Sequence, residues 1–127
     1  MQIPSGHQTI MPYLMLADAA GFIEFTKEVF QAEHSFNRFK EDQKSIMHAE
    51  IRINECTIMF CDSGNEWPAQ NANLFIYVDN ADETYHRALE KGAQSKMELS
   101  DQDYGRTCGV TDPCGNTWWI TSISHQK

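Results

Sequence analysis

The sequence predicts an α+β fold made of two tandem βαβββ modules, and two internal repeats support the prediction. A turn and a strand-like run around Thr57 recur around Thr117, sixty positions later. A strand that leads into a helical pattern, at 13–18, recurs at 75–80, sixty-two positions later. Because a helical pattern precedes each turn and strand, the nearly constant offset indicates a duplicated unit.

The first module is expected to start with a strand at 13–16 and to continue as a helix. Asp18 suits the N-cap position, because its short side chain accepts a hydrogen bond from a free backbone N–H at the helix start. Apolar residues recur along one helical stripe: Phe22, Phe25, Val29 and Phe30. Three strand-like runs follow, near His34–Lys40, Ser45–Ile53 and Cys56–Cys61.

The second module repeats this order, with a strand at 73–78 and then a helix. Asn80 is the predicted N-cap, and Gly92 supplies a left-handed residue after the helix end. The Asp-Pro-Cys-Gly-Asn sequence at 112–116 is a strong turn signal. The strand-like runs lie near Gln94–Leu99, Arg106–Thr111 and Thr117–Ile123.

Length favours a single domain over the 127 residues, 1–127. Module one is expected to span about 8–62 and module two about 73–124. The segment between them, about 63–72, is polar and contains Gly64 and Pro68, so it is expected to be a linker.

The composition excludes several classes of partner. A net charge of −8 disfavours nucleic acid and anionic membrane surfaces. The chain has neither an apolar run of membrane-spanning length nor a signal-peptide pattern. Its four cysteines form no Cys-x-x-Cys pair, which favours free thiols and a cytoplasmic location.

The order of these elements, with the final Gly-Arg-x(5)-Asp-Pro-x-Gly-Asn-x-Trp block, resembles the glyoxalase/bleomycin resistance/extradiol dioxygenase superfamily, also called vicinal oxygen chelate. Within it, the runs 11–14, 47–51 and 104–106 look most like the PhnB-like branch. The resemblance implies a curved, cup-like mixed eight-stranded sheet with the helices on the outside and a small-molecule site in the cup.

Strand alternation predicts which side chains face this cup. Leu14, Leu16, Ile58, Phe60, Trp118 and Ile120 are expected to pack on the helices, as are Met47, Ala49, Ile51 and Ile53. Arg52 falls on the cup face, and Cys108 is a further candidate for it. The predicted ligand-binding residues are Met11, Tyr13, Met15, His48, Glu50, Met59, Cys61, Asn73, Phe75, Tyr77, Arg106 and Trp119. The two thiols, Cys61 and Cys108, are expected to be inert.

Metal-dependent members of the superfamily place metal ligands on four strands, and the resemblance maps those positions to Met11, Met59, Asn73 and Trp119. None of these side chains is a good ligand for a hard or borderline divalent ion. The sequence therefore predicts no metal and no other cofactor, and it argues against lactoylglutathione lyase and ring-cleaving dioxygenase chemistry.

His48 and Glu50 keep a catalytic alternative open. They lie two residues apart on one strand face, so they could hold a relocated metal or act as an acid–base pair. The competing interpretation pairs Glu50 with Arg52 or Arg106 and leaves His48 bonded to a strand neighbour. The remaining histidines are less informative: His7, His34, His86 and His125.

Two functions follow, and the sequence favours binding over catalysis. The first is a protein that sequesters an aromatic or cationic compound, stacked on the cup aromatics Tyr13, Phe75, Tyr77 and Trp119. The second is a lyase, isomerase or dioxygenase-type enzyme that uses the His48/Glu50 pair or a relocated metal. A homodimer is expected, because open sheets leave exposed edges and an apolar face that a second copy would cover.

Overall fold

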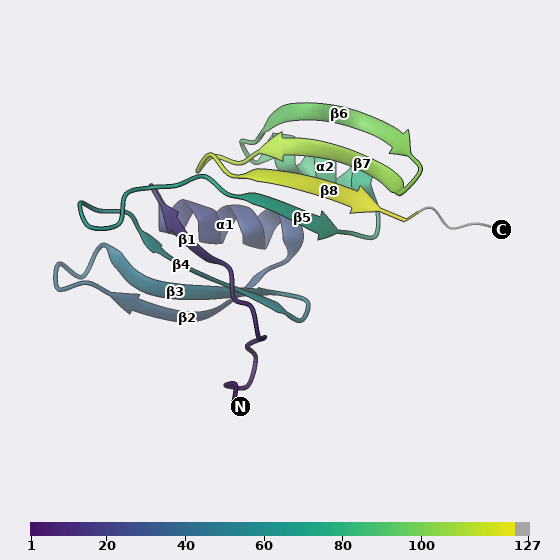
Figure 1. The fold of residues 1–127 in the computed structure, drawn as a ribbon. Coiled ribbons are helices and arrows are strands. Elements are labelled where there is room, and N and C mark those ends of the chain that lie inside the picture. The colour runs from purple at the N-terminus through teal and green to yellow at the C-terminus, as the bar shows by residue number, and fades with distance from the viewer. Residues whose placement is uncertain (124–127) are drawn as a thin grey trace. The chain divides into compact units, whose positions relative to one another are not determined.

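Each predicted module forms its own sheet and its own helix. The computed structural model describes residues 1–123, and the chain divides into two compact units, residues 1–71 and the part from residue 72 onward. Each unit has the order βαβββ, and its helix lies against one face of its four-stranded sheet (Figure 1). We call the opposite face of each sheet its open face.

The first unit contains β1 (Tyr13–Leu16), α1 (Ala19–Phe30), β2 (Glu33–Phe39), β3 (Ile46–Ile53) and β4 (Cys56–Asp62). The sheet order is β1-β4-β3-β2, with β1 parallel to β4 and the other pairs antiparallel. The predicted helical stripe is buried, and the ring of Phe22 packs edge-on against Phe60 of β4 at a centroid distance of 5.0 Å. Both rings are fully buried, so this contact joins the helix to the sheet within the core.

The second unit contains β5 (Asn73–Tyr77), α2 (Ala81–Glu90), β6 (Gln94–Gln102), β7 (Gly105–Thr111) and β8 (Thr117–Ser122). Its sheet order, β5-β8-β7-β6, is the same arrangement one module later. Trp118 and Ile120 of β8 are almost fully buried on the helix side, as alternation predicts.

Both helices begin where the sequence predicts. Asp18 Oδ1 accepts a hydrogen bond from the Gly21 backbone N–H at 3.0 Å. Asn80 Oδ1 accepts one from Glu83 N–H at 3.1 Å. Gly92 follows α2 with a φ of +105°, the left-handed conformation that glycine adopts without steric cost.

The turn at 112–116 is organised by the buried carboxylate of Asp112. This carboxylate accepts hydrogen bonds from the backbone N–H groups of Cys114 and Asn116, both at 2.9 Å, and from the Trp118 indole at 2.8 Å. Gly115 adopts a φ of +95° within the turn. The sequence signal at this turn thus reflects an aspartate that joins the turn to the core of the second unit.

Strand alternation is correct along most strands but fails at Met47. Ile46, Ala49, Ile51 and Ile53 are buried, whereas Met47 is 43% exposed. The register between β2 and β3 shifts there, because Arg38 pairs with His48 and Phe39 pairs with Ile46, which leaves Met47 as an extra residue. A bulge leaves its extra residue out of the ladder and can re-aim the side chain. Met47 is exposed and lines the same pocket as Tyr13 and Met15, so the prediction that it packs on the helix is wrong.

The predicted α+β fold with two βαβββ modules is confirmed, and its eight strands form two four-stranded sheets. The joining of both modules into one domain stays a prediction. No helix within residues 1–123 is long and apolar enough to cross a membrane.

Candidate functional site

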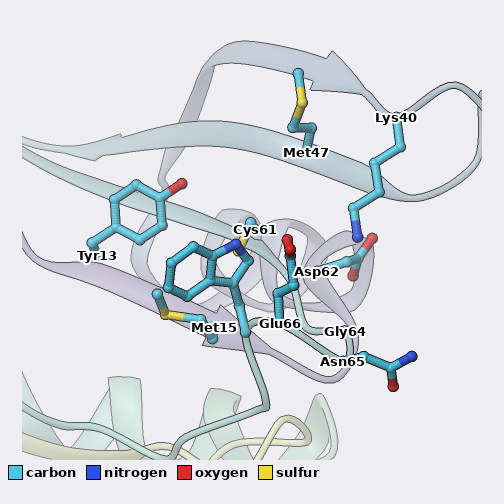
Figure 2. A pocket seen from close by; sticks show the side chains of 10 residues that line it. Tyr13, Met15, Lys40, Met47, Cys61, Asp62, Gly64, Asn65 and Glu66 are labelled. Carbon is cyan, nitrogen blue, oxygen red and sulfur yellow. The ribbon is translucent and has the colours of Figure 1, made fainter.

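A pocket of about 690 Å³ lies in the first unit, at the ends of β1 and β4 and beside the segment that follows β4. Figure 2 shows Tyr13, Met15 and Cys61 around the pocket, with Lys40 and Met47 across from Met15. The lining residues are Tyr13, Met15, Lys40, Met47, Cys61, Asp62, Gly64, Asn65, Glu66 and Trp67. Three of the predicted ligand-binding residues, Tyr13, Met15 and Cys61, are thus brought together.

The chain from 63 to 70 forms one wall of this pocket and is fixed by backbone hydrogen bonds. Ser63 N–H donates to the Leu16 carbonyl at 2.7 Å, and Gln70 N–H donates to the Met15 carbonyl at 3.1 Å. A third bond, from Gly64 N–H to the Trp67 carbonyl at 2.9 Å, closes a turn. Trp67 therefore lines the pocket from a segment tied to β1, although 60% of its surface is exposed.

Asp62 lines the pocket, but its carboxylate is occupied by the fold. Oδ1 accepts a hydrogen bond from Ala19 N–H at 2.8 Å, and Oδ2 accepts one from Ile46 N–H at 2.7 Å. The side chain thereby ties the end of β4 to the start of α1 and the start of β3. We therefore assign Asp62 to the framework of the pocket.

A chain of four polar side chains crosses the open face of the first sheet and ends at the pocket. His7 Nε2 lies 2.8 Å from Glu50 Oε1, and His48 Nε2 lies 3.0 Å from Glu50 Oε2. The Tyr13 hydroxyl lies 3.1 Å from His48 Nδ1. Since Tyr13 also lines the pocket, the hydrogen-bonded chain His7–Glu50–His48–Tyr13 connects to it.

Burial and hydrogen bonding set the ionisation of this chain. Burial by itself would raise the pKa of Glu50, but the hydrogen bonds from His48 and His7 outweigh it, so the pKa lies below its ordinary value. Burial, and then the neighbouring Cys61 thiol, raise the pKa of Tyr13. Burial likewise raises the pKa of Cys61. The open face therefore carries a carboxylate, a neutral phenol and a neutral thiol.

The segment before β1 holds His7 in place. Gln8 Nε2 donates to the Thr57 carbonyl at 2.8 Å, and Thr57 N–H donates to Gln8 Oε1 at 3.2 Å. The Thr57 hydroxyl donates to the Gly6 carbonyl. These bonds fasten the residues on both sides of His7 to the start of β4, so the imidazole reaches Glu50.

The open face of the second sheet carries aromatic residues. Phe75 and Trp119 are direct neighbours across β5 and β8, and the Phe75 ring lies 5.3 Å from Tyr77 and 6.4 Å from Tyr104. The Trp119 indole donates to Asn73 Oδ1 at 3.1 Å. The predicted residues Asn73, Phe75, Tyr77 and Trp119 thus share one face, and none of them lines the pocket of the first unit.

Arg106 and Cys108 lie on the helix side of the second sheet. Arg106 Nε and Nη2 donate to the two oxygens of Asp82 in the first turn of α2, at 2.9 and 3.0 Å. This pairing raises the pKa of Arg106 and lowers that of Asp82. Cys108 is fully buried and donates to the Ile120 carbonyl, and burial raises its pKa to about 11. The expectation that Cys108 faces the cup is therefore wrong.

The competing sequence interpretation of Glu50 is also wrong, because its partners are two histidines and neither Arg52 nor Arg106. Glu50 pairs with His7, one of the histidines that the sequence left without a role. Another of them, His125, lies outside the described residues.

The four positions that the family resemblance maps to metal ligands carry side chains that suit a divalent metal poorly, and the absence of a metal stays a prediction. Met11 Sδ accepts a hydrogen bond from Gln8 N–H at 3.4 Å, and Asn73 Oδ1 accepts the Trp119 indole N–H. Thioethers are soft, and indole is only a donor; Met59 adds a second thioether. Within residues 1–123, no three His, Cys, Asp or Glu side chains are placed to hold one metal ion.

Seven of the ten lining residues lie outside the predicted set. Trp67 had a signal, because a large aromatic residue in an otherwise polar linker is unusual. His7, which belongs to the hydrogen-bonded chain and not to the pocket lining, had no such signal, since a histidine before the first strand belongs to no periodic pattern. The other lining residues outside the predicted set are Lys40, Met47, Asp62, Gly64, Asn65 and Glu66.

Comparison with known proteins gives one family and one common fold. The family model of the Glyoxalase/Bleomycin resistance protein/Dioxygenase superfamily matches residues 8–120. An uncharacterized protein of Mycobacterium bovis is 30% identical over 121 residues, which cover 86% of this chain and 79% of the relative.

Solved structures share the fold at lower identity. TnmS3, an antibiotic-binding protein from Streptomyces sp. CB03234, has a TM-score of 0.72 at 16% identity and covers 93% of this chain and 100% of its own. A PhnB protein from Bacillus cereus has a TM-score of 0.70 at 18% identity and covers 91% of this chain and 100% of its own.

Proposed function

The chain belongs to the Glyoxalase/Bleomycin resistance protein/Dioxygenase superfamily, and we propose that it is a small-molecule-binding protein whose ligand is a planar aromatic compound. The pocket of the first unit is the proposed site. An antibiotic-binding protein is among the structures with this fold, which makes sequestration of a toxic compound the favoured role.

The lining of the pocket is the observation that supports this proposal. Trp67 and Tyr13 offer aromatic faces, and Met15 and Met47 offer polarizable thioethers that adapt to a flat ligand. Lys40 and Glu66 provide charge at the same site. An apolar cavity of several hundred Å³ with a few polar groups is the usual form of a small-molecule site.

Calorimetric titration of the purified protein with naphthalene derivatives tests the proposal. Trp67→Ala should weaken binding by about 1–3 kcal/mol, the usual effect of losing one aromatic stack. Trp119→Ala is the matched control in the second unit. The alternative that Trp119 and Phe75 form the stacking surface stays a prediction, and a larger loss in Trp119→Ala than in Trp67→Ala would favour it.

Acid–base catalysis is the second candidate, supported by the chain His7–Glu50–His48–Tyr13. A carboxylate that orients an imidazole next to a phenol can move a proton to or from a bound ligand. Deuterium uptake next to the carbonyl of 2-acetonaphthone in heavy water is a direct assay. Uptake above the buffer rate that Glu50→Gln abolishes would support catalysis, and uptake at the buffer rate would exclude this reaction.

We also propose that the protein is a homodimer. Phe75 and Tyr77 are 52% and 61% exposed on the open face of the second sheet, and a second copy could cover them. Light scattering across a dilution series gives the mass directly. A mass of one chain at high concentration and moderate salt would contradict the dimer.

A further inference from the structure

We infer that the pocket prefers aromatic ligands that carry an N–H or O–H donor, because the hydroxyl proton of Tyr13 is already donated to His48. This inference rests on the proposed binding function and names the class of ligand that the same site selects. It follows from the direction of each hydrogen bond in the chain that ends at Tyr13.

Glu50 sets the direction of the hydrogen bonds in this chain. An ionised carboxylate only accepts hydrogen bonds, so both histidine nitrogens that contact it must carry their protons. His7 Nε2 therefore donates to Oε1, and His48 Nε2 donates to Oε2. The side chain of Glu50 is only 14% exposed, which limits competition from water for these two bonds.

The tautomer of His48 then decides the role of Tyr13. A neutral imidazole with its proton on Nε2 has a lone pair on Nδ1 and can only accept there. With this neutral tautomer, the Tyr13 hydroxyl, 3.1 Å from Nδ1, is the donor. Phe36, whose ring centroid lies 5.7 Å from that of His48, packs beside the imidazole.

Tyr13 consequently presents only lone pairs to the pocket. It has one hydroxyl proton, and the pKa that burial and Cys61 raise keeps that proton in place. A ligand N–H or O–H can donate to the Tyr13 oxygen, whereas an ether or carbonyl oxygen finds no proton there. The neighbouring Asp62 oxygens already accept backbone N–H groups, so Tyr13 is the acceptor that β1 offers to a ligand in the pocket.

The test compares 2-naphthol, which has a donor, with 2-methoxynaphthalene, which has only an acceptor, by calorimetric titration at neutral pH. The intact protein should bind 2-naphthol about two- to tenfold more tightly, the range expected for one net hydrogen bond. Tyr13→Phe removes the acceptor and should remove this preference by weakening 2-naphthol alone.

His48→Phe provides the opposite change, because it keeps a ring at position 48 but frees the Tyr13 proton. In this variant 2-methoxynaphthalene should bind more tightly than it does to the intact protein, by a similar factor. Circular dichroism of each variant verifies that the fold is retained. Glu50→Gln, which no longer forces the His48 tautomer, should reduce the preference while leaving the Tyr13 and His48 rings in place.

Equal affinities in the intact protein, or tighter binding of 2-methoxynaphthalene, would overturn the inference and leave the aromatic pocket standing. Failure of both probes to bind, with Trp67 intact, would instead refute the proposed pocket function. A preference that survives both Tyr13→Phe and His48→Phe would place the acceptor elsewhere and would also overturn the inference.

Discussion

The two units have one topology and two different open faces. Met59 and Trp119 occupy equivalent positions, sixty residues apart, and their antiparallel partners are Glu50 and Gly109. Glu50 is the centre of the polar chain, whereas Gly109 leaves room for an indole: a Cβ there would lie 2.6 Å from the Trp119 ring. The equivalent positions therefore hold a carboxylate in one unit and the space for an aromatic ring in the other.

The next position on each open face shows the same contrast. Two residues before Glu50 is His48, which is hydrogen-bonded to Tyr13. Two residues before Gly109 is Thr107, whose hydroxyl pairs with that of Thr121 at 2.8 Å. The first unit thus has titratable groups on this face where the second has a closed pair of hydroxyls.

On the helix side, in contrast, the two units accept the first helical N–H group in similar ways. The first helical N–H group needs an acceptor in each unit. Asp62 at the end of β4 accepts from Ala19 N–H, and Ser122 at the end of β8 accepts from Ala81 N–H. Packing of helix on sheet therefore constrains these positions in both units, whereas the open faces carry different side chains.

The largest expected loss of stability distinguishes the buried face of β8 from its open face. Trp118→Ala should lower the free energy of unfolding by about 3–5 kcal/mol, because it empties a buried site and leaves Asp112 without its indole donor. Urea denaturation measures this change. Trp119→Ala, on the open face, should cost clearly less, and the reverse order would refute the assignment of faces.

The next largest loss of stability is expected from the two side chains that accept the first helical N–H groups, Asp62 and Ser122. Asp62→Ala should lower the free energy of unfolding by about 2–3 kcal/mol, because it leaves two backbone N–H groups without an acceptor next to a buried core. Ser122→Ala removes a single neutral acceptor and should cost roughly 1 kcal/mol. Equal losses in the two variants, measured by the same denaturation, would show that the second bond of Asp62, to Ile46, contributes nothing.

Gly109 offers a test of the open-face difference itself. Gly109→Ala should cost about 1–2 kcal/mol, since the added methyl group collides with the Trp119 ring. The double variant Gly109→Ala/Trp119→Ala should cost less than the sum of the two single changes, because the clash is absent. Additive losses in unfolding experiments would place the strain elsewhere.

The smallest effect concerns acid pH and is predicted by direction alone. The lowered pKa of Glu50 means that its stabilising contribution is present above the ordinary carboxylate range. The contribution is lost as pH falls through the folded-state pKa. Glu50→Gln should therefore be less stable at neutral pH, and its stability should depend less on pH on the acid side.

Asp82→Asn is the matching change in the second unit, because its hydrogen bond with Arg106 lowers the pKa of Asp82 in the same direction. Unfolding free energies of both variants across the acid range separate the two contributions. A Glu50→Gln profile parallel to that of the intact protein would contradict the role of the two histidines.

The sequence by itself determined the fold, because local signals and internal repetition agree. Residue type and spacing predicted the helix starts at Asp18 and Asn80, the glycine turn after α2 and the buried stripe of α1. Alternation also placed Tyr13, Met15 and Cys61 on one face of their strands, since a strand's period of two fixes which side chains share a face, and the family resemblance made that face the ligand side.

Tertiary structure decided what depends on contacts between distant residues. His7 contacts Glu50 across forty-three positions, and hydrogen bonds from its segment to β1 place Trp67 at the pocket. Neither contact produces a periodic pattern in the sequence. The bulge at Met47 depends on pairing with β2, and the pairing of Arg106 with Asp82 depends on where α2 lies. Backbone periodicity encodes the faces of single strands, whereas partners across the chain are selected only when the sheet and its helix pack together.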